Sequence, residues 1–203
     1  MFKELTDFIK TTEFSYIYNE SADGRVNSSL NEDIVLDKLK AEFPDDIELP
    51  NIRCWYDFKY KGEPVNLKIS NMKAPDNISS KKGMAYALTG IDGDEFSGSW
   101  DHFHEKLFNN LGKDKNADYY LLIVNSNNFN DCFCTSLKSI NNLRSNGNNL
   151  PFQCNWSENR EIVERTFEES KDYILSVYYE SWKKKTSPFK KLQSKMEEEG
   201  EHE

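Results

Sequence analysis

Residues 55–68, WYDFKYKGEPVNLK, constrain the fold of this chain most, because their pattern fits one simple arrangement. Apolar residues occupy every second position on both sides of residues 61–62, which is the alternation of two half-buried β-strands. If residues 61–62 form a two-residue turn, Asp57 lies opposite Asn66. Because side chains alternate between the faces of a strand, we expect Asp57, Asn66 and Lys68 on one face of a hairpin.

An acid, an amide and a lysine on one strand face suit metal-dependent hydrolysis of phosphodiester bonds. Hard divalent cations such as Mg²⁺ prefer oxygen ligands, which the Asp57 carboxylate, the Asn66 amide and a strand carbonyl can supply. Lys68 can orient the attacking water and offset developing charge. The alternative is an exposed hairpin with ordinary charged residues on its solvent face, because a D…NxK string also arises by chance.

The spacing of these residues resembles a known motif. Asp57, eight intervening residues and then Asn66-Leu67-Lys68 resemble the bipartite motif of the PD-(D/E)xK nuclease superfamily, and most closely that of type II restriction endonucleases. The resemblance implies an Mg²⁺ ion, for which Mn²⁺ can substitute, bound by Asp57, Asn66 and Leu67. It also implies catalytic roles for Asp57, Asn66 and Lys68.

Asn66 departs from the family pattern, which usually has Asp or Glu at this position. An amide ligates a cation through its oxygen but brings no charge, so metal binding weakens. Two explanations are open: the missing carboxylate comes from Glu63, Glu48 or Glu32, or the chain is a weakened variant of an active enzyme. In the family, a helix before the hairpin often contributes an acid, and Glu32 is the position that matches. Alternatively, Glu32 only caps its own helix in a capping box with Ser29.

Two polar segments, residues 71–82 and 141–155, suit contacts with DNA. Lysines suit backbone phosphates, while Asn, Gln, Ser and Arg side chains can reach base edges. The segment NMKAPDNISS…AYAL resembles the one that follows the catalytic lysine in blunt-cutting restriction enzymes, and LPFQCNW resembles part of their recognition region. The candidate DNA contacts are Asn71, Lys73, Asn77, Ser79, Ser80, Lys81, Lys82, Asn141, Arg144, Gln153 and Asn155. The alternative for both segments is an ordinary polar loop.

Charge and cysteine content narrow the class of protein. A net charge of -9 argues against a protein that coats nucleic acid non-specifically, although it allows a locally basic cleft. No apolar run reaches the ~20 residues of a membrane span, and the N-terminus does not look like a signal peptide. We therefore expect a cytoplasmic protein, no membrane contact and four reduced core cysteines.

The order of the expected elements predicts a mixed α/β domain with a central mixed β-sheet flanked by helices, like that of the restriction endonucleases. Helices are expected at 1–12, 29–43, 99–111 and 166–185, and strands at 54–60, 65–69, 118–125, 131–137 and 150–156. Residues 1–185 are expected to form one domain, and residues 186–203 a basic and then acidic disordered tail.

These features favour a type II restriction endonuclease that acts as a homodimer on a short palindromic site in double-stranded DNA. One alternative is a DNA-binding module on a nuclease fold, in which Asn66 marks lost catalysis. Another is a nuclease for branched or damaged DNA in repair or recombination.

Overall fold

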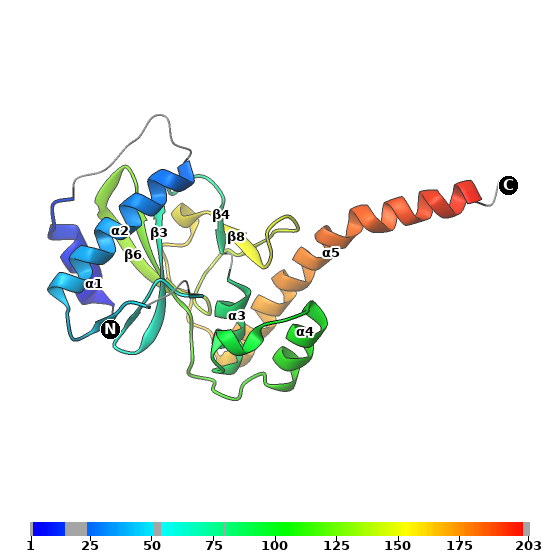
Figure 1. The fold of residues 1–203 in the computed structure, drawn as a ribbon, viewed down its shortest axis with the longest axis horizontal. Coiled ribbons are helices and arrows are strands. Elements are labelled where there is room, and N and C mark those ends of the chain that lie inside the picture. The colour runs from blue at the N-terminus through cyan, green and yellow to red at the C-terminus, as the bar shows by residue number, and fades with distance from the viewer. Residues whose placement is uncertain (1, 15–23, 51–53, 79, 201–203) are drawn as a thin grey trace.

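The expected hairpin lies in the middle of the main sheet (Figure 1). The computed structural model describes residues 2–14, 24–50, 54–78 and 80–200, except the side chains of 24–30 and 199–200. Strands β2 (Phe58–Tyr60) and β3 (Glu63–Ser70) pair antiparallel in the predicted register. Lys61 and Gly62 have φ angles of 52° and 86°, as a two-residue type I′ turn requires. The predicted turn and register are confirmed.

The first strand of the hairpin is shorter than the alternation predicts. It begins at Phe58 and not at Cys54, because Trp55 turns into the core. The Trp55 ring packs on that of Tyr119 with centroids 5.7 Å apart, and the Tyr119 hydroxyl donates to the Trp55 carbonyl at 2.8 Å. Side-chain packing of Trp55 therefore replaces strand pairing before Asp57.

The main sheet has the strand order β1-β2-β3-β5-β6 and is mixed. Strands β1 (Ile47–Glu48) and β6 (Asn128–Ser136) form its edges, and β3 pairs parallel with β5 (Tyr120–Asn125). The apolar residues of β5 are buried on both faces of the sheet, which explains the continuous apolar run of its sequence.

Helices cover both faces of this sheet (Figure 1). Helices α1 (Lys3–Thr11) and α2 (Gly24–Glu42) pack on one face, where Leu5, Ile9 and Leu39 are buried. Helices α3 (Lys81–Thr89), α4 (Trp100–Asn109) and α5 (Phe167–Gly200) lie on the other side, around a core that includes Leu121 and Ile123. The chain thus forms the predicted single mixed α/β domain with a central mixed sheet flanked by helices.

Helix α2 begins at Gly24, five residues before the predicted start at Ser29. Residues 25–42 contain neither Gly nor Pro, which are the residues that disfavour a helix strongly. The helix therefore extends back to Gly24. The predicted capping box of Ser29 and Glu32 is therefore wrong, because both residues lie inside the helix.

A small second sheet extends the molecule beyond the main one. Strands β4 (Asp76–Ile78), β8 (Phe152–Cys154) and β7 (Arg144–Ser145) pair antiparallel in the order β4-β8-β7. The short 3-10 helices η1 (Gly93–Phe96) and η2 (Trp156–Glu158) complete the described elements. All four cysteines are free thiols; Cys132 and Cys154 are buried in the core, whereas Cys54 and Cys134 are half-buried. Among the described residues, the helices are too short or too polar to span a bilayer.

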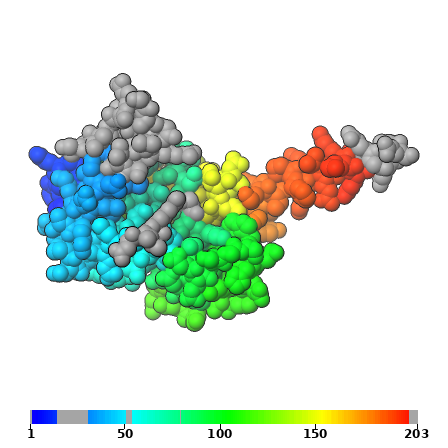
Figure 2. Space-filling view, viewed as in Figure 1, coloured from blue at the N-terminus to red at the C-terminus, as the bar shows by residue number. Residues whose placement is uncertain are grey.

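Helix α5 is much longer than the sequence predicts. It starts as expected, with a capping box in which the Thr166 N–H donates to Glu169 at 2.8 Å and the Glu169 N–H donates to Thr166 at 3.3 Å. It then continues through Pro188 to Gly200 and projects from the body (Figure 2). The predicted end near Lys185 and the disorder expected from position 186 are wrong for 186–200, because this segment is rich in strong helix formers.

Candidate active site

Asp57 immediately precedes β2, and its carboxylate accepts hydrogen bonds from residues of β3. Its Oδ2 atom accepts from the Leu67 backbone N–H at 2.7 Å and from the Asn66 side-chain amide. Burial raises the pKa of Asp57, while the Leu67 N–H, Lys68 and Asn66 oppose this rise. Asp57 is therefore a half-buried acid held in one position by the strand that carries the other candidate residues.

Strand β3 presents Asn66 and Lys68 on the same face. The alternate residues Val65, Leu67 and Ile69 are buried in the core, and this burial fixes the face on which Asn66 and Lys68 stand. Both of these side chains are half-buried. The structure thus brings Asp57, Asn66 and Lys68 together, as the hairpin register predicts.

Glu32 reaches the same place from helix α2. Its carboxylate accepts from the Ile69 backbone N–H and interacts electrostatically with Lys68 and Asp57. Burial raises the pKa of Glu32 to about 7, against the opposing effect of Lys68. Glu32 therefore adds a second carboxylate to the group formed by Asp57, Asn66 and Lys68.

The two other candidate carboxylates lie elsewhere. Glu63 is at the turn end of β3, where its negative neighbour is Asp114. Glu48 is exposed on β1 at the edge of the sheet. Of the three acids that could offset the missing charge at Asn66, Glu32 is the one that lies with Asp57.

Asp76 is a further acid near this group that the sequence analysis did not single out. It begins β4, interacts electrostatically with Glu32, and accepts from the Trp156 indole N–H at 2.8 Å. Trp156 is fully buried, so it is a core residue that fixes Asp76. The available signal was that Asp76 is the single acid between Lys68 and Lys82.

The chemistry of these groups fits a hard divalent cation. The described residues contain no set of three or more His, Cys, Asp or Glu side chains grouped for metal binding. The oxygen donors are instead mixed: the carboxylates of Asp57 and Glu32, the Leu67 carbonyl and the Asn66 amide oxygen. Asn66 presents its NH₂ group to Asp57, so metal binding requires this amide to turn its oxygen inward.

Replacing Glu32 with Gln is expected to stabilise the metal-free protein at alkaline pH. The pKa of Glu32 is about 7 in the folded chain, above the ordinary 4.5, so its proton favours folding. The contribution of Glu32 to stability should be greatest below pH 4.5, fall as pH rises to about 7, and then stay low. The difference between the two pKa values corresponds to roughly 3 kcal/mol in the free energy of unfolding, or up to roughly 10 °C in Tm.

The measurement is thermal unfolding in EDTA between pH 4.5 and 8.5. Glu42→Gln, an exposed position at the end of the same helix, is the matched control and should keep the wild-type dependence on pH. If Tm depends on pH in the same way in Glu32→Gln and in the wild type, the pKa of Glu32 is not raised in the folded protein.

The small sheet aligns three of the candidate DNA contacts. Asn77, Gln153 and Arg144 are direct partners across β4, β8 and β7, so their Cα atoms form one row. The Asn146 amide links this row, because it donates to Asn77 at 2.8 Å and to Gln153 at 3.4 Å. Neighbouring strands are about 4.8 Å apart, so the row is roughly 10 Å long.

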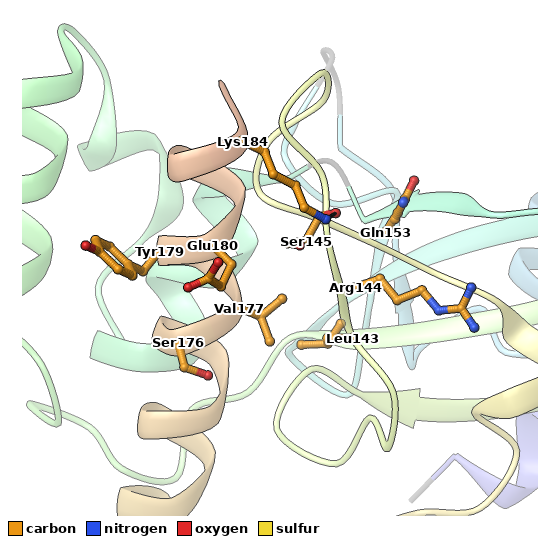
Figure 3. A pocket seen from close by; sticks show the side chains of 9 residues that line it. All are labelled: Leu143, Arg144, Ser145, Gln153, Ser176, Val177, Tyr179, Glu180 and Lys184. Atoms are coloured by element: carbon orange, nitrogen blue, oxygen red, sulfur yellow. Dashed lines mark hydrogen bonds between the residues drawn. The ribbon is translucent and has the colours of Figure 1, made fainter. Parts of the chain in front are cut away.

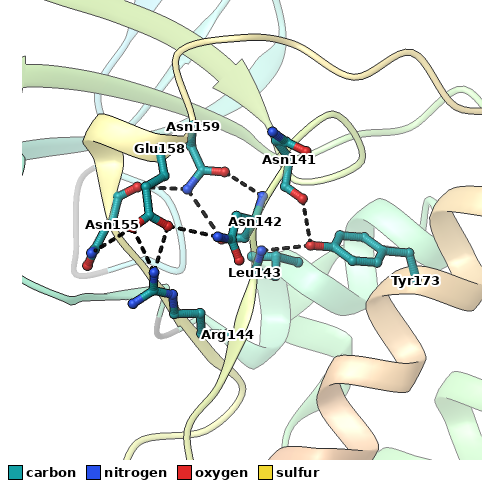
Figure 4. Close-up of polar contacts among 8 residues, drawn as sticks. All are labelled: Asn141, Asn142, Leu143, Arg144, Asn155, Glu158, Asn159 and Tyr173. Atoms are coloured by element: carbon teal, nitrogen blue, oxygen red, sulfur yellow. Dashed lines mark hydrogen bonds and ion pairs between the residues drawn. The ribbon is translucent and has the colours of Figure 1, made fainter.

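Polar residues gather at Arg144, which is one end of this row (Figure 4). Glu158 accepts from the Arg144 guanidinium at 2.7 Å and from the Asn155 amide at 3.2 Å. The Asn141 carbonyl accepts from the Tyr173 hydroxyl at 2.9 Å. Glu158, which no sequence pattern indicated, thus holds both Arg144 and Asn155, whereas Asn141 contacts Tyr173 of α5.

The candidate DNA contacts that follow β3 are divided between exposed and structural positions. Asn71 and Lys73 are exposed, and the Asn71 side chain accepts from the Lys73 N–H at 3.1 Å. Ser80 caps α3 by accepting from the Gly83 N–H at 2.9 Å. Lys81 lies over the Trp100 ring at 4.3 Å, and Lys82 pairs with Asp94 at 2.7 Å. Ser79 lies outside the described residues.

A pocket of about 510 Å³ separates the row from helix α5 (Figure 3). Arg144 and Gln153 line it from the strands, and Lys184 and Glu180 line it from α5. The Lys184 ammonium donates to the Ser145 carbonyl at 3.2 Å, which ties the helix to β7. A cationic helix side chain therefore lies beside the polar row.

Comparison with known proteins adds no family to this picture. No protein-family model matches the chain, and no curated protein matches it in sequence.

Proposed function

We propose that the chain is an Mg²⁺-dependent endodeoxyribonuclease that cuts duplex DNA at a specific short site, as type II restriction endonucleases do. The observation that carries this proposal is the meeting of Asp57, Asn66 and Lys68 with Glu32 from a different helix. Two acids, an amide and a lysine suit hydrolysis of a phosphodiester bond. A solvent-exposed hairpin would not bury an acid beside a second acid.

Each residue has a role in this reaction. Asp57, Asn66, the Leu67 carbonyl and Glu32 would hold the cation, which when bound polarises the phosphate and makes its bound water more acidic. Lys68 orients the attacking water and offsets negative charge on the phosphate. Its proximity to Asp57 and Glu32 supports this assignment.

The small sheet supports specific recognition of duplex DNA. Its row of Asn77, Gln153 and Arg144 is roughly 10 Å long, and the major groove is about 12 Å wide. Amides recognise adenine edges and arginine recognises guanine edges. A homodimer on a palindromic site, in the cytoplasm, would apply two such rows and two catalytic groups to one sequence.

One observation favours a second function, that of a DNA-binding module without catalysis. Asn66 carries no charge and hydrogen-bonds the Asp57 carboxylate, so it occupies an acceptor that a cation would need. In that case the same recognition surface binds DNA but leaves it uncut.

The test is cleavage of several plasmids of known sequence in Mg²⁺, in Mn²⁺ and in EDTA. We expect discrete fragments with either metal ion and intact plasmid in EDTA, since the acids need a cation to act on phosphate. Sequenced fragment ends should share one short palindrome. Retained binding of DNA without any cutting in either metal ion would favour the binding module, and random fragments would exclude sequence-specific cleavage.

A further inference from the structure

One apolar stripe runs along most of helix α5. On the half that packs against the body, Tyr178 and Trp182 face α4, with the Trp182 and Trp100 rings 5.0 Å apart. On the other half, the stripe continues with Phe189, Leu192 and Met196, whose exposed fractions are 68%, 56% and 67%. One half of the stripe is covered and the other half is bare.

The spacing shows that both halves belong to one seam. Trp182, Phe189 and Met196 follow one another at intervals of seven residues, and Tyr178, Lys185 and Leu192 form a second series of the same interval, apolar except at Lys185. Two interleaved series of this period form the contact face of a helix pair. The bare half therefore has the pattern of a helix that packs against another helix.

The body of the protein stops supporting α5 just before the bare half. Gly147 approaches so closely that a Cβ atom there would lie 2.8 Å from the Lys184 Cβ and 2.8 Å from the Lys185 nitrogen. Beyond this point the helix projects away from the domain (Figures 1 and 2). The segment 185–200 is roughly 24 Å long at 1.5 Å per residue.

Charges along this segment indicate the kind of partner. Six lysines and no acid lie between positions 183 and 195, and three glutamates follow at 197–199. A parallel copy of the helix would place like charges side by side. An antiparallel copy places the lysines of each chain near the glutamates of the other.

We propose that the projecting half of α5 pairs antiparallel with the same segment of a second copy of this chain, burying Phe189, Leu192 and Met196. This inference rests on the proposed function, because the pairing would join the two subunits that a palindromic site requires. Its test measures association without DNA. Failure of the pairing is therefore distinguishable from failure of the nuclease activity.

The first test is sedimentation equilibrium of the full chain without DNA. Leu192→Glu should weaken dimerisation by about tenfold or more, because it places a charge in the apolar seam. Ser194→Glu adds the same charge two residues away, off the seam, and should leave the dimer intact. A monomeric wild-type chain, or equal weakening by both variants, would overturn the proposal.

The second test exchanges charges. Variant A carries Glu197→Lys and Glu198→Lys, and variant B carries Lys190→Glu and Lys191→Glu. Each should dimerise more weakly than wild type, because like charges meet at both ends of the pair. A mixture of A and B should form a heterodimer at least tenfold more stable than either homodimer. Failure of the mixture to associate would exclude the antiparallel arrangement.

Discussion

Lys68→Ala is expected to reduce the rate of DNA cleavage by roughly 10³-fold, the scale for loss of one preorganised electrostatic contact. Lys68 stands on the β3 face that carries Asn66, and it lowers the pKa of both Asp57 and Glu32. In the proposed reaction, its removal takes away the group that orients the attacking water. It also makes both acids harder to ionise at neutral pH, so metal binding should weaken as well.

The measurement is the single-turnover rate at saturating enzyme, with DNA binding measured separately. Lys113→Ala, an exposed lysine in the loop after α4, is the matched control and should cut at the wild-type rate. DNA binding in Ca²⁺ should be nearly unchanged in both variants. If Lys68→Ala cuts within a few-fold of wild type, the assigned site is wrong.

Asn66→Asp is expected to increase the cleavage rate by ~10²–10³-fold, because it restores a charged oxygen ligand. It should also tighten Mg²⁺ binding. The substitution converts a favourable amide–carboxylate hydrogen bond with Asp57 into a contact between two acids. The same change should therefore have opposite effects on the metal-free and metal-bound protein.

Thermal unfolding separates these two effects. In EDTA, Asn66→Asp should lose about 1.5–3 kcal/mol of stability, the range for a hydrogen bond to a charged group. Saturating Mg²⁺ should return the variant to the wild-type stability or above it. Asn127→Asp, an exposed position in the β5–β6 turn, provides the control. An Asn66→Asp variant without activity and without a response to Mg²⁺ would leave only the DNA-binding function.

The sequence predicted the hairpin and the position of its polar face because both depend on local rules. A Lys-Gly turn with alternating apolar residues allows one register, and that register places Asp57 beside Asn66. The strand predicted at 118–125 is β5, and its continuous apolar run is buried. The helix start predicted at 166 is correct, and the capping box of Thr166 and Glu169 fixes the start of α5 there.

Errors at element boundaries have tertiary causes. The alternation from Cys54 to Tyr60 predicted a full strand, but packing of Trp55 against Tyr119 ended it at Phe58. A polar composition predicted a disordered end, whereas residues 186–200 of α5 are helical. A polar composition shows that a segment has too few apolar residues to be buried in a core. Helix formation in an exposed segment depends instead on the intrinsic helix propensity of its residues.

The local sequence pattern and the tertiary packing both decided which residues the candidate site contains. The alternation of β3 was enough to join Asn66 and Lys68, because two-residue spacing is a local property of a strand. The family resemblance favoured Glu32, and the packing of α2 beside β3 places Glu32 near Asp57, whereas Glu63 lies at the turn end of β3. The alignment of Asn77, Gln153 and Arg144 likewise depends on pairing between distant strands, which no local pattern specifies.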